Sequence, residues 1–500
     1  MRISKNKILT SPSDLNNFVG CKFLIKNEIK FLNREIQKNK ESIDQKLWKE
    51  FGIKHEKKHF ELFKKKYKKI ISIKKDLSEA ERYKKTVEAV KKGYDLIYHA
   101  FLIDEDFRGE ADFLIKVNTV SDLGDYSYEV YDTKKSSKPK PRHIYQITAY
   151  SSMLSKIQGL LPEKMYLIDG SDITHQYKTK EFIDYYLFTK KNFDNYLINI
   201  NKEKIYPEKS DHCNICDYTD ECEKIWEKDN YINQVAKINR SQIEKLKKVK
   251  ITTVAQLAKA NPNKLKIKIN KQTLKDRISQ AQLQEEKRET GKSKYIILDP
   301  DIGKGFYKLP EPDDGDLFFD IEGFPQEDGR GFEYLHGIYF KSKNDFEFKY
   351  FWAKDFKKKY EKENFVELIK FFKGHFNKYP KAHLYHYNSY EKRSLRQLAS
   401  LYSSDFPEGS NFVDTLLRGE KFVDLFLIIN QCARTSEKDM SLKSIEGVLY
   451  NFQRKGDVKK AEDSVKLYDY WLTSKDEDTK KDIIEYNKED CVSTYQLREF

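Results

Sequence analysis

The 500-residue sequence predicts an α/β protein with two α/β units and a small helical segment between them. Two observations predict this class. Alternating apolar and polar residues, typical of strands, run through Ala111–Val117 and Tyr126–Thr133, and helical patterns flank them. A second strand pattern, Leu317–Glu322, follows the turn residues of Pro310–Gly315 and precedes further helical patterns. A chain of this length has room for roughly two to four domains.

The first unit is expected to cover residues 1–228. The run Ser11–Asp14 is an N-cap signature and predicts a helix that carries Cys21. A Lys-rich helical region is expected over about 40–70. The remaining elements are expected in the order strand, strand, strand, helix, strand, over Phe101–Ile103, Ala111–Val117, Tyr126–Thr133, about 142–155 and Lys164–Ile168.

Residues 235–280 change character and predict a helix, a tight turn and a second helix. This pattern resembles a helix-hairpin-helix, which grips the DNA backbone through turn amides. Lys250 occupies the position where that motif has a glycine. The alternative to a DNA-binding motif is a helical linker without a binding role. Residues 281–310 are expected to form a linker, and residues 311–500 the second α/β unit. Because the sequence ends at Thr494–Phe500 inside an amphipathic helical pattern, we expect it to be a truncated chain.

The composition favours a polyanionic partner. Lys and Arg number 94 against 80 Asp and Glu, which gives a net charge of +14, and such a surface suits nucleic acid. The alternative is a solvated Lys-rich surface. Six cysteines are too few for a disulfide framework and suit a reducing cytosol. No signal-peptide pattern follows Met1, and no apolar run approaches the ~20 residues that span a bilayer. The sequence therefore predicts a cytoplasmic protein without membrane contact.

Two acids and a lysine in the first unit form the first candidate site. Asp112 lies inside an apolar strand pattern, where a carboxylate is costly unless it faces a cleft or a metal ion. Asp132 and Lys134 are two residues apart and therefore point to the same face of a strand. Both carboxylates can bind Mg²⁺, and the lysine can orient or help deprotonate a water molecule. The alternative is two surface acids and a lysine on an edge strand.

These residues carry a family resemblance. The Asp132-x-Lys134 pair, the preceding Gly109-Glu-Ala-Asp112 and the later Gln146-x-x-x-Tyr150 resemble the PD-(D/E)XK nuclease superfamily, and more closely its RecB-like branch. The resemblance implies a restriction-endonuclease-type core. It also implies that Gln146 and Tyr150 lie on a helix that touches DNA and the active site.

The run Gly52–Glu56 looks like the first motif of the same branch. That motif supplies a helical His or Glu that completes the metal site. Either His55 or Glu56 is the ligand by this resemblance, with Glu56 the better fit. The alternative for His55 is a partly exposed residue of a Lys-rich helix.

Four cysteines enclose the first candidate site in the sequence. Cys21 stands alone near the N-terminus, and Cys213, Cys216 and Cys222 follow about 190 residues later. Several RecB-like nucleases, the CRISPR-associated ones among them, bind a [4Fe–4S] cluster with one cysteine before the core and three after it. The resemblance therefore implies a [4Fe–4S] cluster here. Zinc is the alternative metal, and His212 could then replace one thiolate. The remaining alternative is that the cysteines are core residues that bind no metal.

A second set of acids lies in the second unit. Asp320 and Glu322 end a strand pattern on one face, and Tyr486 and Asp490 are four residues apart and share a helix face. Glu391 lies between these pairs in the chain. Four acids and a tyrosine that converge on two metal ions would suit phosphodiester hydrolysis, with Tyr486 placing or deprotonating the water.

These segments resemble the RNase H-like DEDD exonucleases, in the variant with a tyrosine in its last motif. The middle acid of that family is normally Asp, and Glu391 holds the position here. Val423–Leu425 and Ser441–Ile445 also fit the family, as a strand with a further Asp and the helix after it. The resemblance implies an RNase H-like domain with a metal-dependent exonuclease site.

The pairing of both parts resembles one uncharacterised bacterial family of RecB-like nucleases. It implies a Mg²⁺- or Mn²⁺-dependent nuclease that hydrolyses DNA, as single strands or duplex ends, in repair, recombination or processing, with RNA as a further substrate class. It also implies a superfamily 1 helicase as partner, in the same polypeptide or in trans. One alternative is a nucleic-acid-binding scaffold with decayed catalytic sites. Another is an exonuclease active only in the C-terminal domain.

Overall fold

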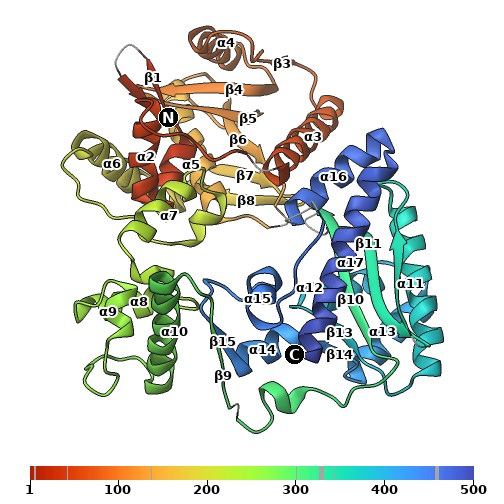
Figure 1. Ribbon diagram of the computed structural model, residues 1–500. Helices are drawn as coiled ribbons and strands as arrows, with labels where there is room; N and C mark the ends of the chain where they lie inside the picture. Colours follow the sequence, from red (N-terminus) through yellow and green to blue (C-terminus); the bar gives the residue numbers. More distant parts are fainter. Residues whose placement is uncertain are drawn as a thin grey trace. The chain divides into compact units, whose positions relative to one another are not determined.

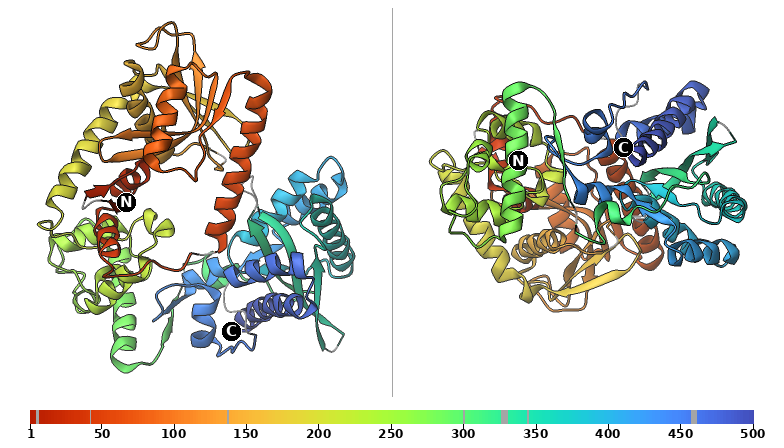
Figure 2. Two further views of the ribbon diagram at one scale, coloured as in Figure 1. Left: turned by 90° about the horizontal axis from the view of Figure 1, so that it is seen from above. Right: turned by 60° about the horizontal axis from the view of Figure 1, so that its bottom comes forward.

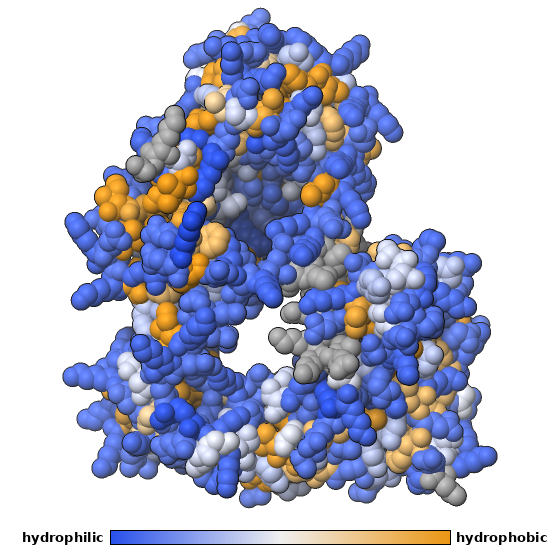
Figure 3. Space-filling model, turned by 45° about the horizontal axis from the view of Figure 1, so that its top comes forward, coloured by the Kyte–Doolittle hydropathy of each residue, from blue (hydrophilic) through white to orange (hydrophobic). Residues whose placement is uncertain are grey.

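The chain folds into two compact units, an N-terminal unit of Met1–Glu223 and a C-terminal unit of Lys224–Gln326 and Gly331–Phe500. The first boundary lies close to the expected one at residue 228. None of the described helices is long and apolar enough to cross a membrane. The face drawn in Figure 3 is mostly hydrophilic, as a charged content of 35% predicts. A computed structural model describes residues 1–4, 7–41, 43–136, 138–299, 301–325, 331–343, 345–456 and 461–500.

The N-terminal unit is built on a six-stranded mixed sheet (Figure 1). Two of its strand pairs, β3–β4 and β6–β7, are parallel, and the other neighbours are antiparallel. Parallel neighbours need a crossover connection, and α4 (Glu79–Lys91) and α5 (Pro141–Gln158) supply the two crossovers. The strands in spatial order are β3 (Ile70–Ser72), β4 (Leu96–Asp104), β5 (Phe107–Val117), β6 (Ser127–Thr133), β7 (Lys164–Ile168) and β8 (Thr174–Lys178).

Helices cover both faces of this sheet (Figures 1 and 2). On one face α5 packs with α1 (Pro12–Gly20) and α6 (Ile183–Asn199) over Ile97 and Leu114. On the other face α3 (Ile43–Lys66) places Phe60 and Phe63 against Tyr98 and Phe113. The aromatic residues of α3 therefore fix this helix beside the β4–β5 pair.

Cys21 does not lie within the helix that the sequence predicts for it. Ser11 caps α1 as expected, but α1 ends at Gly20 and α2 (Lys22–Leu32) begins one residue later. Cys21 between them has an extended backbone with φ −164°. The side chain therefore sits at the N-terminus of α2, where backbone N–H groups point outward.

A helical segment opens the C-terminal unit, with α8 (Arg240–Lys248), α9 (Val254–Ala258) and α10 (Lys271–Thr290). Lys250 in the turn between α8 and α9 has φ +62°, the left-handed conformation that a glycine adopts more easily. The expected linker at 281–310 is corrected, because α10 continues to Thr290. After it, β9 (Tyr295–Ile297) pairs with β15 (Ala433–Thr435).

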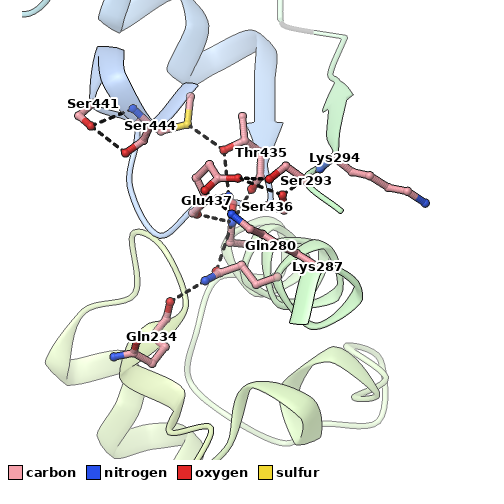
Figure 4. Close-up of polar contacts among 12 residues, drawn as sticks. Gln234, Gln280, Lys287, Ser293, Lys294, Thr435, Ser436, Glu437, Ser441 and Ser444 are labelled. Carbon is pink, nitrogen blue, oxygen red and sulfur yellow. Dashed lines mark hydrogen bonds and ion pairs between the residues drawn. The ribbon is translucent and has the colours of Figure 1, made fainter. Parts of the chain in front are cut away.

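Side-chain contacts join this helical segment to the rest of the unit (Figure 4). Gln280 Nε2 on α10 donates to the backbone oxygen of Thr435 at 2.8 Å, and Lys287 Nζ lies 2.5 Å from Glu437 Oε2. Ser293 Oγ donates to Glu437 Oε1 at 2.8 Å. The segment and the following α/β layers are thus parts of one compact unit.

The main sheet of the C-terminal unit has five strands. The first three in the chain form an antiparallel meander, then β13 pairs in parallel with β10 and β14 in parallel with β13. In spatial order the strands are β12 (Asp345–Trp352), β11 (Gly331–Ser342), β10 (Leu317–Pro325), β13 (Leu384–His386) and β14 (Phe422–Asp424).

Two helical layers cover this sheet. Phe319 faces a core built with α11 (Lys358–Lys378), α12 (Tyr390–Leu401) and α13 (Pro407–Arg418). Phe318 faces the opposite core, which includes α14 (Leu425–Cys432), α15 (Leu442–Leu449) and α17 (Glu477–Glu499). Since Asp320 alternates with Phe319, it shares the face of Phe318 and points toward α17. The remaining helices are α7 (Thr219–Lys228) and α16 (Ala461–Ser474).

Candidate metal and active sites

Three carboxylates converge in the C-terminal unit. Strand β10 carries Asp320 and Glu322 on one face, and α17 carries Asp490. One oxygen from each side chain lies within 4.8 Å of the other two. Oxygen ligands so close together form a group that can hold a divalent cation such as Mg²⁺.

A glycine allows α17 to approach the sheet here. Gly337 on β11 pairs with Asp320, and a Cβ atom on Gly337 would lie 1.7 Å from Asn487 Oδ1. Asn487 Nδ2 donates to Asp320 Oδ2 at 2.6 Å. A side chain at residue 337 would therefore push away the helix that brings Asp490 to the site.

The burial of these acids changes their protonation. Burial, and then the charges of Asp490 and Glu322, raise the pKa of Asp320 well above its usual range. Burial, followed by Asp490, raises the pKa of Glu322 to about 8. Like charges in a buried group favour the protonated forms, so a bound cation would favour the ionised forms.

Glu391 lies at the margin of this group. Its charge also raises the pKa of Asp320, but its own Oε2 atom lies 3.4 Å from Nδ1 of His386. Burial raises the pKa of Glu391, and His386 lowers it in part. The predicted fourth acid thus contacts His386 and is not one of the three carboxylates whose oxygens lie within 4.8 Å of one another.

Two cations and the predicted tyrosine complete the site. Arg454 Nη2 lies 2.5 Å from Asp490 Oδ1, and Arg454 also forms hydrogen bonds of 2.7 and 3.1 Å with Glu446. Lys443 Nζ donates to Tyr486 Oη at 2.6 Å. Burial, and then Asp490, raise the pKa of Tyr486. Arg454 and Lys443 could not be predicted from the sequence, because neither has a fixed spacing to the acids.

Asp112, Asp132 and Lys134 meet in the N-terminal unit. Asp112 lies on β5, Asp132 near the end of β6, and Lys134 directly after β6. Lys134 forms an ion pair with Asp132. Thr133 donates from its backbone N and from Oγ1 to Asp112 Oδ2, each at 2.7 Å. The adjacent antiparallel strands thus bring the three predicted residues together.

An irregularity in the sheet aims Asp112 into this group. The ladder pairs Tyr98 with Phe113 and Ala100 with Ala111, and His99 between them has φ +57°. Phe113 faces α3 whereas Ala111 faces the α5 side, although residues two apart normally share a face. Such interruptions of a ladder redirect side chains and are frequent beside functional sites.

Of the two first-motif candidates, Glu56 reaches this group. Its carboxylate accepts a hydrogen bond from His99 Nε2. Burial, Asp132 and then Glu56 raise the pKa of Asp112 well above its usual range. His55 lies elsewhere: its Nδ1 atom is 3.8 Å from Asp172 Oδ1.

Gln146 and Tyr150 lie on α5 next to the acids. Gln146 Nε2 donates to Tyr150 Oη at 2.7 Å, and burial followed by the charge of Asp132 raises the pKa of Tyr150. A Cβ atom on Gly109 would lie 2.5 Å from the Tyr150 ring. Gly109 thereby leaves room for this tyrosine. His143, which the sequence did not predict, lies near this group, and burial followed by the charge of Lys134 lowers its pKa to about 3.

The four predicted cysteines line one cavity, together with His212. Burial and the neighbouring thiols raise the pKa of Cys216 to about 11 and of Cys222 to about 12. Ser210 donates its backbone N–H to Cys213 Sγ at 3.4 Å. His212 Nε2 lies 3.2 Å from Asn17 Oδ1. Four thiols gathered in this way fit a cationic centre, which favours their ionised forms.

A five-stranded sheet of this order, with paired acids on its central strand and an acid on its last helix, defines an RNase H-like class of domain. Residues 317–500 match the family model RNase_H_2, which describes the RNase H superfamily. This match confirms the predicted C-terminal RNase H-like domain and indicates a nuclease-type hydrolase that acts on nucleic acids. A search of curated proteins finds no match to the chain.

Proposed function

We propose that this protein is a nuclease that hydrolyses DNA phosphodiester bonds with Mg²⁺ or Mn²⁺. The observation that carries the proposal is the convergence of Asp320, Glu322 and Asp490 within 4.8 Å in the RNase H-like domain. These three residues would hold the cation, which when bound polarises a phosphate oxygen and activates a water. RNA is a second substrate class of the same chemistry.

The neighbouring residues have roles that follow from their contacts. Tyr486 positions the attacking water, and the hydrogen bond from Lys443 to its Oη atom orients the phenol. Glu391 lies in the first turn of α12 and contacts His386, and its one methylene more than Asp would let it extend from there to an ion beside Asp320. Arg454 compensates the negative charge of Asp490.

We infer a second, RecB-like PD-(D/E)XK site in the N-terminal unit. Asp112, Asp132 and Glu56 would hold a cation there. Lys134, ion-paired with Asp132, orients or deprotonates the water. Gln146 and Tyr150 support this group: Tyr150 is buried and accepts a hydrogen bond from Gln146, so Gln146 is the member of the pair that would meet the nucleic acid. Burial alone would lower the pKa of Lys134, but Asp132 and Asp112 raise it, so the lysine is a cation until the carboxylates bind a metal ion.

The four cysteines would bind one [4Fe–4S] cluster, with zinc as the alternative. The support is their convergence around one cavity in the N-terminal unit. Such a centre ties the joint between α1 and α2 to the segment after α6, so its role is structural. Protein purified without oxygen should be brown and contain about four irons per chain. A colourless protein with one zinc at these cysteines would refute the cluster in favour of zinc.

The net charge of +14 supports a nucleic-acid substrate, and a role in DNA repair, recombination or processing follows from that substrate. A superfamily 1 helicase, in the same polypeptide or in trans, would supply the unwound strand. This partner rests on the family resemblance alone.

One observation favours a second candidate function, a nucleic-acid-binding scaffold without catalysis. Arg454 forms an ion pair with Asp490 and so places a cation beside a metal ligand. In a decayed site such an arginine would replace the metal ion. Binding that falls steeply with salt, without cleavage under any divalent cation, would favour this function.

The proposal is tested by cleavage of labelled DNA by the full chain with Mg²⁺ or Mn²⁺. Asp320→Asn should lower the rate of release of end nucleotides by roughly 100-fold or more, since it removes charge stabilisation of the transition state. Asp476→Asn is the matched control, because Asp476 caps α17 through Thr479 N at 2.9 Å and Asn caps equally well. Equal activity of wild type and Asp320→Asn would refute an active site in the C-terminal unit.

A second pair of variants distinguishes cleavage by the N-terminal site from cleavage by the C-terminal site. Lys134→Ala should abolish the cleavage that Asp320→Asn leaves, whereas the adjacent Lys135→Ala should retain it. If Lys134→Ala retains all cleavage and Asp320→Asn abolishes it, the exonuclease is active only in the C-terminal domain.

A further inference from the structure

Two histidines and an aspartate form a cluster apart from both acidic sites. His55 and His59 lie on α3, and Asp172 lies in the turn between β7 and β8. One ligand atom from each lies within 4.8 Å of the other two. The side chains of His55 and His59 are only 2% and 7% exposed, so the two histidines are interior, whereas Asp172 meets them from the surface.

The sequence spacing of the two histidines suits zinc. His55-Glu-Lys-Lys-His59 places two imidazoles four residues apart on one face of a helix, which is the spacing by which a helix supplies two zinc ligands. The observed helix keeps both rings together, with centroids 4.7 Å apart. Imidazole and carboxylate are both common zinc ligands.

The distances within the cluster fit one ion. His59 Nε2 lies 3.0 Å and His55 Nδ1 lies 3.8 Å from Asp172 Oδ1. Ligands about 2.0–2.1 Å from a tetrahedral zinc ion lie about 3.3 Å from one another. The observed separations lie on either side of that value, so small side-chain shifts would place all three around an ion.

The ligand atoms of this cluster lie close together. His55 places Nδ1 toward Asp172, so Nδ1 is the atom that would bind the ion, and Nε2 on the other side of the ring is buried without a hydrogen-bond partner among the described residues. Asp172 Oδ2 lies 2.5 Å from Lys58 Nζ, which leaves Oδ1 directed toward the histidines.

The turn that carries Asp172 is held in place. Asp169 Oδ1 accepts from the backbone N of Ser171 at 2.8 Å and of Ile173 at 3.0 Å. Asp169 Oδ2 lies 2.7 Å from His175 Nε2. The carboxylate of Asp172 is thus presented from a fixed loop rather than from a free surface chain.

We propose that His55, His59 and Asp172 bind a zinc ion and tie α3 to the β7–β8 turn. Glu56, although adjacent to His55, points to His99 and the Asp112 group, so it does not serve this ion. Three protein ligands leave one position for water. The site requires neither nuclease activity nor the four cysteines.

The test measures zinc uptake by the full chain, with the cysteine centre as purified and with excess Mg²⁺ to occupy the acidic sites. Wild type should bind one zinc more per chain than Asp172→Asn or His59→Gln. The affinity at this site should fall at least about 100-fold in either variant, since even outer-shell changes cost 10–100-fold. Asp172 is 44% exposed, so Asp172→Asn should fold normally.

Lys58→Gln is the matched control, because it removes a contact of Asp172 without removing a ligand. It should keep the full zinc count and the zinc-induced rise in melting temperature. Equal zinc counts in wild type, Asp172→Asn and His59→Gln would overturn the proposal. Loss of the zinc in Lys58→Gln as well would also overturn it, since the cluster would then be an ion-pair network. Because metal content is the readout, the result is independent of nuclease activity.

Discussion

When divalent cations are removed by a chelator, the free energy of unfolding of the C-terminal unit should fall as the pH rises. The cause is Glu322, which is buried beside Asp490 and has its pKa raised from the usual 4.5 to about 8 by burial first and by Asp490 next. The unfolded chain releases this proton near pH 4.5, whereas the folded chain keeps it until about pH 8. Between these values the folded state binds more protons, so the free energy of unfolding falls as the pH rises.

The size of the effect follows from the width of this window. Each pH unit costs about 1.4 kcal/mol per proton, so a pKa raised from 4.5 to about 8 gives at most about 5 kcal/mol. Asp320 and Asp490 share the proton uptake, which spreads the slope over the group. Mg²⁺ or Mn²⁺ stabilises the carboxylates and should flatten the dependence.

The assay is urea unfolding of the full chain between about pH 5 and pH 8, with EDTA or with Mn²⁺, followed by tryptophan fluorescence. Trp352 and Trp471 report on this unit, since their rings pack at 4.9 Å. Glu322→Gln should remove most of the slope in EDTA. Parallel slopes for wild type and Glu322→Gln, or no effect of Mn²⁺ on either, would refute the reasoning.

Three further outcomes are expected. Burial lowers the pKa of His336 to about 3, so below about pH 6.5 the unfolded chain binds a proton that the folded chain does not, and the free energy of unfolding falls by up to about 5 kcal/mol toward pH 3. His336→Gln should reduce this loss of stability at acidic pH in urea titrations, and an unchanged loss would contradict the prediction. Phe193→Ala should cost about 3–5 kcal/mol in the N-terminal unit, because Phe193 is 0% exposed and packs on Phe18 at 5.2 Å; a loss below about 1 kcal/mol in urea unfolding would speak against that core. Cys216→Ser should lower both the bound metal and the unfolding midpoint of the N-terminal unit, and normal metal content would exclude Cys216 as a ligand.

Short-range periodicity predicted much of the fold and of the acidic site. The alternation of Leu317–Glu322 placed Asp320 and Glu322 on one strand face, and the four-residue spacing placed Tyr486 and Asp490 on one helix face. The RNase H-like domain is confirmed by the family match. The strand at Lys164–Ile168 has the predicted bounds. Each of these strand and helix patterns lies within a single element.

The features that the sequence did not reveal depend on contacts between distant elements. Arg454 reaches Asp490 from a loop 36 residues away, and no spacing rule relates them. The left-handed His99 residue lies where the β4–β5 ladder is interrupted. Asp172 meets His59 across 113 residues. Cys21 falls between two helices because α1 ends at Gly20, a boundary that periodicity fixes poorly.

The most direct test of the account is cleavage of 5′- and 3′-end-labelled single-stranded DNA by the wild-type chain, with Mn²⁺ and with EDTA. We expect stepwise release of nucleotides from one end that requires Mn²⁺ and disappears in Asp490→Asn, while DNA binding persists. DNA binding by the wild type without cleavage in Mg²⁺ or Mn²⁺, or equal cleavage by wild type and Asp490→Asn, would contradict it.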